Sequence, residues 1–375
     1  MSKNVFVGVI SGTSVDGIDL ALLEISGEIT GQTTTSINIL ATFTAPLSSE
    51  LRATLLALGQ PGQDNIDDLG SADAALGEAI GHAVNVLLED QGIENAQVAA
   101  IGCHGQTVRH RPEGASPFTL QIGDPNRIVE ITRITTIADF RRRDMAAGGE
   151  AAPLVPPFHN ALFRNASETR VVLNIGGIAN VTVLSHDSSE NVRGFDTGPG
   201  GALLDAWIYH HKQTPYDAFG AWGASGKVHR ALLDDLLKDP YLSKPPPKST
   251  GREHYNLAWL EPYLKGHDVA VVDTQATLTE FTAQTITTAL ATWASSCQRI
   301  LVCGGGRHNT HLLERLRSLT PHPVETTDEH GIDGDGLEAG AFAWLAHQTL
   351  NALPGNDPSV TGARGFRILG GIYQP

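Results

Sequence analysis

The chain has 375 residues, 41% of them hydrophobic, and a formal net charge of −15. This length is enough for two packed domains. The acidic balance argues against sequence-independent nucleic-acid binding, which needs a basic surface. Three cysteines without CxxC spacing favour a reduced setting. No apolar run approaches membrane-spanning length and no signal-peptide core is evident, so we expect a cytoplasmic protein without membrane partners.

The first candidate site lies in residues 5–24, which predict a strand, a turn of small polar residues and a second strand. Glycines in such a turn let backbone N–H groups approach a phosphate closely. Carboxylates at Asp16 and Asp19 are suited to the divalent metal ion that accompanies phosphate. The alternative is an ordinary hairpin with a long polar turn. The candidate nucleotide-binding residues are Gly12, Thr13, Ser14, Val15, Asp16, Gly17, Ile18 and Asp19.

A second glycine turn follows in residues 171–184, where Gly176 and Gly177 join two β-rich runs. A two-residue Gly-Gly connection is a strong hairpin signal, because glycine readily adopts the positive φ that such turns require. In that register Asn174 and Asn180 point to opposite sides of the hairpin, so only one of them reaches a shared ligand. We take Asn174, Gly176 and Gly177 as nucleotide-binding candidates. Two such hairpins predict two similar halves that face each other across a cleft.

A third element, residues 299–316, predicts a strand, a triple glycine and a helix. The glycines Gly304, Gly305 and Gly306 permit a flat ring to lie against the main chain. Alone this signal is weak, but after two glycine-turn hairpins it resembles the adenosine site of an actin-like ATPase. The sequence has no GxxxxGK[ST] loop, and its GxGxxA match at residues 334–339 follows a polar loop instead of a strand.

Seven motifs together resemble the anhydro-N-acetylmuramic acid kinase family of the sugar kinase, heat-shock ATPase and actin superfamily. The proline-rich segment around Lys248 and the FDTGPG block are particular to that family. The motifs are SGTSVDGID at residues 11–19, CHGQT at 103–107, ADFRRRD at 138–144, NIGG at 174–177, GFDTGPG at 194–200, PPPKSTGRE at 245–253 and CGGG at 303–306.

The alternation of strand and helix patterns predicts an α/β fold. The resemblance implies two actin-like (ribonuclease H-like) domains that flank a nucleotide cleft. We expect an N-terminal domain over residues 1–145, joined by part of the C-terminal segment. Residues 146–375 then form the second domain with the adenosine site, and residues 146–157 are the expected hinge or crossover. The resemblance also implies ATP and Mg²⁺ as cofactors, and it suggests a homodimer.

Asp196 is the candidate catalytic residue. It follows a strand-like run and precedes a Gly-Pro-Gly turn and a helix. Because a helix N-terminus favours a charged carboxylate, we expect Asp196 to be ionised. The alternative role is an N-terminal cap of that helix. The resemblance implies that Asp196 is the catalytic base and contacts substrate. The family pattern usually has Asn where this chain has Gly201, a difference that affects fine positioning near the base.

Two further substrate candidates are His104 and Arg141. Arginine pairs well with carboxylate and phosphate, so Arg141 can meet the lactyl carboxylate or a phosphate. Of the three consecutive arginines at 141–143, at least one is expected to form an exposed salt bridge. His104 follows a strand in a glycine-flanked turn and either lines the sugar pocket or is a structural histidine. The Lys248 segment has no role that the residues define.

Three functions fit these observations. The first, implied by the resemblance, is a kinase that opens 1,6-anhydro-N-acetylmuramic acid with water and transfers the γ-phosphoryl group of ATP to O6, in the recycling of cell-wall murein. There Asp196 takes a proton from the attacking water. The second is a plain sugar or carboxylate kinase, in which Asp196 deprotonates an existing hydroxyl. The third is a non-catalytic ATP-binding regulator.

Overall fold

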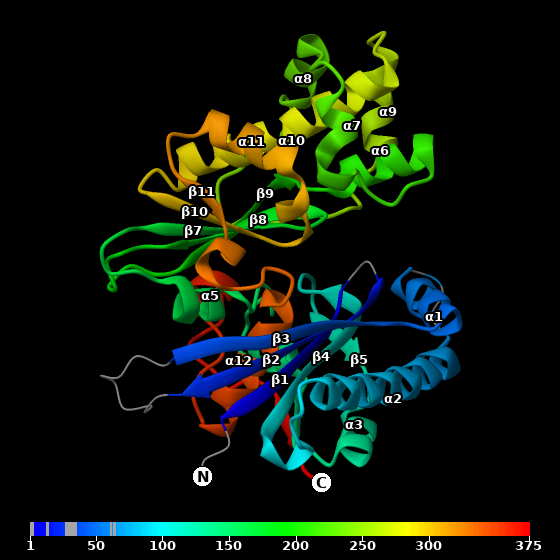
Figure 1. The fold of residues 1–375 in the computed structure, drawn as a ribbon, viewed down its shortest axis with the longest axis vertical. Helices are drawn as coiled ribbons and strands as arrows, with labels where there is room; N and C mark the ends of the chain where they lie inside the picture. Colours follow the sequence, from blue (N-terminus) through cyan, green and yellow to red (C-terminus); the bar gives the residue numbers. More distant parts are fainter. Residues whose placement is uncertain (1–3, 13–14, 27–35, 61, 63–64) are drawn as a thin grey trace. The chain divides into compact units, whose positions relative to one another are not determined.

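The computed structural model describes residues 4–12, 15–26, 36–60, 62 and 65–375 (Figure 1). The chain divides into two compact units, one made of Met1–Leu162 and Asp335–Pro375 and the other of Phe163–Gly334. This division differs from the predicted boundary at 145/146. Residues 146–157, the expected hinge, belong to the first unit, as does the whole C-terminal segment from Asp335.

The first unit is built on one mixed sheet. Its strand order is β12-β6-β4-β1-β2-β3, with β5 paired to β4. Strand β2 is antiparallel to both β1 and β3, whereas β4 is parallel to β1 and to β6. The strands are β1 Val5–Ser11, β2 Gly17–Ser26, β3 Ser36–Pro46, β4 Val98–Arg111, β5 Phe118–Ile122, β6 Thr136–Ala138 and β12 Gly371–Tyr373. The helices are α1 Ser49–Gly59, α2 Ile66–Asp90, α3 Pro125–Thr132, α4 Phe140–Ala146, α5 Pro156–Phe163, α12 Leu337–Leu350 and α13 Pro358–Thr361.

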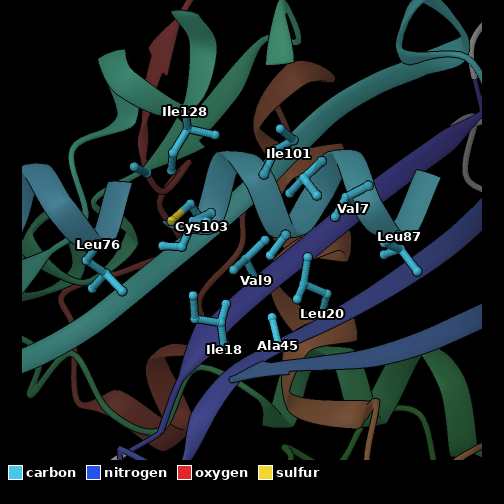
Figure 2. Packing of buried hydrophobic residues seen from close by; sticks show 14 of the residues in the cluster. Val7, Val9, Ile18, Leu20, Ala45, Leu76, Leu87, Ile101, Cys103 and Ile128 are labelled. Atoms are coloured by element: carbon cyan, nitrogen blue, oxygen red, sulfur yellow. The ribbon is translucent and has the colours of Figure 1, made fainter. Parts of the chain in front are cut away.

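Helix α2 packs against one face of this sheet because its apolar residues recur at helical spacing. Leu76 and Leu87 of α2 are buried in one cluster with Val7 and Val9 of β1, as Figure 2 shows. Helix α12 contacts β1, β2 and β4 as well, and it is apolar on nearly all sides. A helix of that composition is stable only when it is buried all round.

Two glycines let α12 lie unusually close to the sheet. A Cβ atom at Gly8 would fall 1.8 Å from the carbonyl oxygen of Ala339, and one at Gly102 would fall 1.9 Å from the carbonyl oxygen of Phe342. Real Cβ atoms never come so near to a backbone oxygen. The absence of side chains at these two positions therefore sets the separation between α12 and strands β1 and β4.

The second unit repeats the scheme. Its sheet has the order β11-β10-β7-β8-β9. Strand β8 is antiparallel to both β7 and β9, and β10 is parallel to both β7 and β11. This shared order is that of a ribonuclease H-like domain, so the predicted α/β fold with two such domains is confirmed. The strands are β7 Arg170–Ile175, β8 Ile178–Leu184, β9 Arg193–Pro199, β10 Arg299–Cys303 and β11 Val324–Thr326. The helices are α6 Ala202–Lys212, α7 Ala221–Ala224, α8 Arg230–Leu236, α9 Leu257–Lys265, α10 Val271–Trp293 and α11 Thr310–Leu319.

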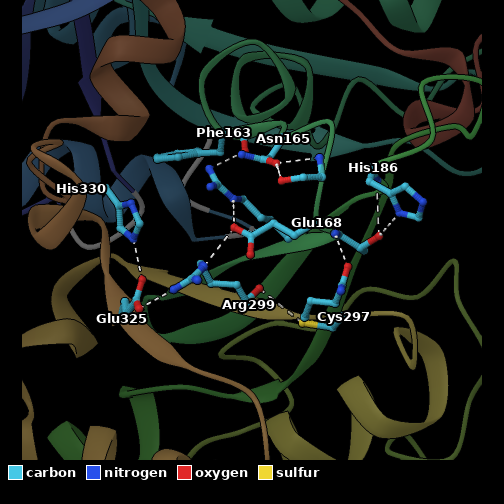
Figure 3. A network of polar contacts seen from close by, with 12 residues as sticks. Phe163, Asn165, Glu168, His186, Cys297, Arg299, Glu325 and His330 are labelled. Carbon is cyan, nitrogen blue, oxygen red and sulfur yellow. Dashed lines mark hydrogen bonds and ion pairs between the residues drawn. The ribbon is translucent and has the colours of Figure 1, made fainter.

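Helices α10 and α11 cover the apolar face of the second sheet, and α6, α8 and α9 form a separate apolar cluster with the first part of α10. A polar network ties neighbouring strands together (Figure 3). Glu168 accepts hydrogen bonds from Arg170 Nε at 2.8 Å and from Arg299 Nε at 3.0 Å. Arg299 also pairs with Glu325, which accepts from His330. No helix among the described residues is long and apolar enough to cross a membrane.

We predict opposite effects for two glycine-to-alanine substitutions in the first unit. Gly102→Ala introduces an overlap with α12 and should lower the free energy of unfolding by about 2–4 kcal/mol. Gly70→Ala, in α2, meets no atom within 4 Å and should raise it by about 0.5–1 kcal/mol, because alanine favours a helix. Urea unfolding measures both values. Equal effects of the two substitutions would contradict the close packing of α12.

Candidate active site

The turn between β1 and β2 is the predicted phosphate-binding turn. Val15 has a φ of 53°, a strained conformation for a β-branched residue, and its side chain is buried. The N–H of Val15 donates to Gly12 O at 3.0 Å, and Arg52 Nε donates to Val15 O at 2.9 Å. These contacts hold the turn in its strained form. The candidates Thr13 and Ser14 lie outside the described residues.

Gln106 supports this turn from the neighbouring strand. Strand β4 is parallel to β1, and Ser11 pairs with Gln106 in that register. With its amide nitrogen toward the turn, Gln106 donates to Ser11 Oγ at 2.7 Å and to Gly12 O at 3.1 Å. Analysis of the sequence did not assign Gln106 a role. The only signal was its place in the CHGQT motif, because the pairing of β1 with β4 is not visible in one sequence.

His104 lies within β4, not in a turn after the strand as predicted. The strand continues to Arg111, because Gly105 takes a positive φ of 68° and the chain bulges there without ending. Burial and the nearby Arg141 lower the pKa of His104 to about 3, so its ring is neutral. Arg141 Nε donates to His104 Nε2 at 2.8 Å, which leaves Nδ1–H to donate to Gly105 O at 2.9 Å. Both ring nitrogens are therefore engaged.

Arg141 is held rigidly by these contacts. Its Nη1 also donates to Ala151 O at 2.7 Å. Burial lowers the pKa of Arg141 to about 10, and the negative charge of Glu338 opposes that shift. Within the described ranges Arg141 has no ion pair with a carboxylate. Arg142, in contrast, is exposed and forms a salt bridge of 2.6 Å with Asp139, which confirms that one arginine of this run is a surface residue.

Asp19 and Asp16 are the predicted metal ligands. Burial raises the pKa of Asp19, and the charges of Asp335 and Asp16 raise it further, while a 2.7 Å hydrogen bond from Thr44 Oγ1 lowers it. A cation would relieve this repulsion. Across the described part of the chain, no three acidic, histidine or cysteine side chains cluster closely enough to bind a metal alone. The arrangement therefore fits Mg²⁺, which typically uses one or two carboxylates together with phosphate and water.

In the second unit, three polar residues lie side by side across neighbouring strands. Asn174 of β7 pairs with Asn180 of β8, and Asn180 pairs with Asp196 of β9. Residues paired in this way share a face of the sheet. The prediction that the two asparagines point to opposite sides is wrong. The turn contains Ile178 as well as the two glycines, because Ile175 pairs with Ala179. The pairing of β7 with β8 is therefore shifted by one residue from the predicted register.

Gly200 and Gly201, which follow β9, are hydrogen-bonded to the β7–β8 turn. The N–H groups of Gly200 and Gly201 donate to Gly177 O at 2.9 Å and to Gly176 O at 2.8 Å. A Cβ atom at Gly201 would lie 3.2 Å from the carboxylate of Asp205. The asparagine usual in the family would therefore require Asp205 to shift, and in this chain the turn is held by backbone contacts.

Asp196 lies inside strand β9, well before α6. Helix α6 begins at Ala202 with Gly201 as its N-cap, so Asp196 does not cap it. A register shift places an extra residue, Thr197, directly after Asp196. Such bulges are frequent beside active sites, where they redirect a side chain.

A distant loop fixes Asp196 through three hydrogen bonds. The N–H of Thr250 donates to Asp196 Oδ2 at 2.9 Å, the N–H of Asp196 donates to Lys248 O at 3.1 Å, and Tyr241 Oη donates to Asp196 O at 2.9 Å. The second carboxylate oxygen, Oδ1, has no hydrogen bond with any described residue. Asp196 is thus oriented through its backbone and one oxygen, while the other oxygen remains available to accept a proton.

Asp196 is ionised at neutral pH, as predicted, but its pKa is shifted in the opposite direction to that expected. We expected a helix N-terminus to favour its charged form, but burial raises its pKa from 3.8 to about 6. The amide of Thr250 and the charge of Lys248 oppose this shift, and Glu253 adds to it. Desolvation is the largest influence on this pKa. A carboxylate with a pKa of this kind is well suited to general base catalysis.

The triple glycine follows β10 and packs against the end of β7. These two strands are parallel, so their carboxyl ends lie together. Gly304 has a φ of 76°, and a Cβ atom there would fall 2.2 Å from Asn174 Oδ1. Gly306 is similarly close to Ile175, whereas a Cβ atom at Gly305 would meet nothing within 4 Å. The second unit therefore brings Asn174, the glycine turns and Asp196 together on one sheet, and Gly305 presents open main chain.

Arg252 was not assigned by the sequence analysis. A Cβ atom at Gly177 would lie 2.7 Å from Arg252 Nε, so the guanidinium covers the β7–β8 turn. Its place in the PPPKSTGRE motif was the only signal, because the contact joins segments far apart in the sequence.

Comparison with known proteins identifies relatives along the whole chain. A family model described as anhydro-N-acetylmuramic acid kinase matches residues 4–375. A protein of that name from Coxiella burnetii is 49% identical over 374 residues, which cover 100% of this chain and 98% of the relative. The anhydro-N-acetylmuramic acid kinase of Photobacterium profundum is 48% identical over 376 residues, with 98% of each chain covered.

Solved structures with similar folds are more distant. An activator of the 2-hydroxyisocaproyl-CoA dehydratase from Clostridium difficile, with bound ADPNP, has 12% identity and a TM-score of 0.47, and the match covers 93% of this chain and 96% of that one. The ROK hexokinase from Thermus thermophilus has 14% identity and a TM-score of 0.34, with 92% and 99% covered. The fold is defined by the strand orders of the two sheets.

The match to the family model and the two relatives agree over nearly the full length of the chain. The chain belongs to the anhydro-N-acetylmuramic acid kinase family.

Proposed function

We propose that this protein is a kinase that uses ATP and water to convert 1,6-anhydro-N-acetylmuramic acid to N-acetylmuramic acid 6-phosphate. The observation that carries this proposal is Asp196, whose half-buried carboxylate is oriented by Thr250 and keeps Oδ1 available for a proton. Family membership identifies the substrate. The reaction consumes ATP, which places it in the cytoplasm, in the recycling of murein. The homodimer remains a prediction.

The proposed reaction couples two bond changes. Asp196 takes a proton from water, and the water oxygen attacks the anomeric carbon C1 as the bond between C1 and O6 breaks. The electron pair of that bond goes to O6, which attacks the γ-phosphorus of ATP and displaces ADP. The proton on Asp196 is then released to solvent. Orientation of the reactants and neutralisation of the phosphate charge supply most of the acceleration.

The nucleotide and its metal are assigned to the glycine turns. In the first unit we assign phosphate binding to the turn from Gly12 to Asp19. In the second unit we assign phosphate binding to Gly176 and Gly177 and adenosine binding to Gly304–Gly306, with Asn174 beside Gly304. Asp16 and Asp19 would hold Mg²⁺, which neutralises charge on the phosphates when it is bound. This assignment is supported by the braced β1–β2 turn and by the open main chain at Gly305.

The lactyl carboxylate of the sugar is assigned to Arg141. The guanidinium is half-buried and has no ion pair with a carboxylate among the described residues, and such a partly desolvated charge is stabilised when an oppositely charged ligand arrives. The N–H at Arg141 Nε donates to His104 Nε2. The role of His104 in this proposal is therefore to orient Arg141 and to form part of the sugar site through its ring.

The test of the function is ADP release with Mg-ATP and the anhydro sugar, in parallel with N-acetylmuramic acid, in water enriched in ¹⁸O. We expect turnover with the anhydro sugar and one ¹⁸O atom at C1 of the phosphorylated product. Asp196→Asn should reduce kcat about 10²–10⁴-fold and should not lower the free energy of unfolding at neutral pH, because it removes a destabilising charge. Turnover of N-acetylmuramic acid alone would instead indicate the plain kinase.

The pH dependence of kcat/KM should report the protonation of Asp196. The base acts only in its ionised form, and its pKa is raised to about 6. We expect a plateau above about pH 7 and a tenfold fall per pH unit well below pH 6. A rate that stays constant down to about pH 4.5 would contradict the assignment of Asp196 as the base.

The role of Arg141 can be tested with a sugar that lacks the lactyl group. Arg141→Gln should lower kcat/KM for 1,6-anhydro-N-acetylmuramic acid about 10–100-fold, because a charge-assisted contact is lost. The same substitution should scarcely change the slower turnover of 1,6-anhydro-N-acetylglucosamine. Arg142→Gln, at the exposed neighbour, is the matched control. An equal loss with both sugars would contradict contact with the lactyl carboxylate.

A further inference from the structure

The loop that holds Asp196 carries a lysine whose charge is not neutralised by a neighbouring acid. Lys248 Nζ donates to Leu242 O at 3.1 Å and to Tyr241 O at 3.4 Å, and it lies 4.8 Å from the centre of the Tyr241 ring. Its partners are two carbonyls and a ring, all of them neutral. Among the described residues Lys248 has no ion pair, so its positive charge can act on Asp196.

The same tyrosine connects this ammonium group to the backbone of Asp196. Tyr241 Oη donates to Asp196 O, and Lys248 O accepts from the N–H of Asp196. Both peptide groups of Asp196 are thus bound by residues that also contact each other. Lys248 and Tyr241 together fix the position of the residue as well as its electrostatic surroundings.

Asp239 anchors this arrangement from the other side of Tyr241. Its carboxylate accepts hydrogen bonds from the N–H of Tyr241 at 2.8 Å, from His254 Nε2 at 2.9 Å and from Trp259 Nε1 at 3.0 Å. Tyr241 also belongs to the apolar cluster that α6, α8 and α9 form. The segment is therefore held by buried contacts on both sides, and small displacements of Tyr241 or Lys248 are opposed.

We propose that Lys248 and Tyr241 are positioning residues for the catalytic base: the carbonyl of Lys248 and the phenol of Tyr241 fix the backbone of Asp196, and the ammonium group of Lys248 supplies a positive charge that acts on its carboxylate. This inference rests on the proposed function, because it takes Asp196 to be the base. It assigns a role to the proline-rich segment that the sequence analysis left without one.

The charges around Asp196 set the direction of the effect. Burial is the largest influence and raises the pKa of Asp196, and Glu253 raises it further. Lys248 and the amide of Thr250 lower it. Lys244 is close enough to influence Lys248 but has no resolved effect on Asp196. Removal of the Lys248 charge should therefore shift the titration of Asp196 upward from about 6.

The experiment compares the pH dependence of kcat/KM in Lys248→Met, Lys248→Arg and the control Lys244→Met. We expect the acid limb of Lys248→Met to move up by about one pH unit, so that its rate falls about tenfold below pH 6 and approaches the wild-type rate at high pH. Lys248→Arg should restore the wild-type limb, and Lys244→Met should not move it. A loss in Lys248→Met by the same factor at every pH would overturn the electrostatic role.

Tyr241→Phe tests the second half of the proposal. It removes the hydrogen bond to Asp196 O and retains the ring beside Lys248. We expect kcat to fall about tenfold with the acid limb and KM unchanged. Wild-type kcat in this variant would overturn a positioning role for the phenol.

A measurement without turnover separates this inference from the proposed function. The carboxyl carbon of Asp196 can be identified in ¹³C spectra by its loss in Asp196→Asn, and its titration followed in the wild type and in Lys248→Met. An upward shift supports the role of Lys248 whether or not the anhydro sugar is the substrate. An inactive wild-type enzyme would refute the proposed function alone, and an unshifted titration would refute the inference alone.

Discussion

The active site depends on one electrostatic constraint, which is that a carboxylate must be withdrawn from water and still be able to ionise. The shift of the Asp196 pKa from 3.8 to about 6 corresponds to an unfavourable free energy on the order of 3 kcal/mol for the ionised form in the fold. This cost is absent below about pH 4, grows as pH rises between those two values, and is fully present above about pH 6. The backbone amide of Thr250 and the ammonium of Lys248 keep it from becoming larger.

The two units hold their turns and candidate site residues in place by different contacts. In the first, the predicted phosphate-binding turn includes a strained valine, and Arg52 and Gln106 contact it from neighbouring elements. In the second, two glycine turns bind each other through backbone groups, and a long loop binds Asp196. In both units the residues that fix these features come from distant segments of the chain. The strand order of each sheet brings such segments together. Because the two sheets share this order, both units hold their turns through residues from distant segments.

Much of the fold follows from local patterns, and the remainder depends on contacts between distant residues. Alternating apolar residues predicted β1, β2 and the hairpin of β7 and β8, and the motifs located Asp196 and the glycine turns. The register of that hairpin was predicted wrongly, because Gly200 and Gly201 bind the carbonyls of the turn and open it to include Ile178. The upward shift of the Asp196 pKa was not predicted, since the loop residues packed around it lie 45 to 54 residues further along the chain.

The path of the chain has a consequence for synthesis on the ribosome. Residues 335–375 belong to the first unit, and their helix α12 fits against Gly8 and Gly102. All of the second unit, Phe163–Gly334, is translated before that helix emerges. The second unit can thus complete its core while the sheet of the first still exposes an apolar face. The nascent first unit therefore exposes apolar surface, which chaperones bind, until α12 has been translated.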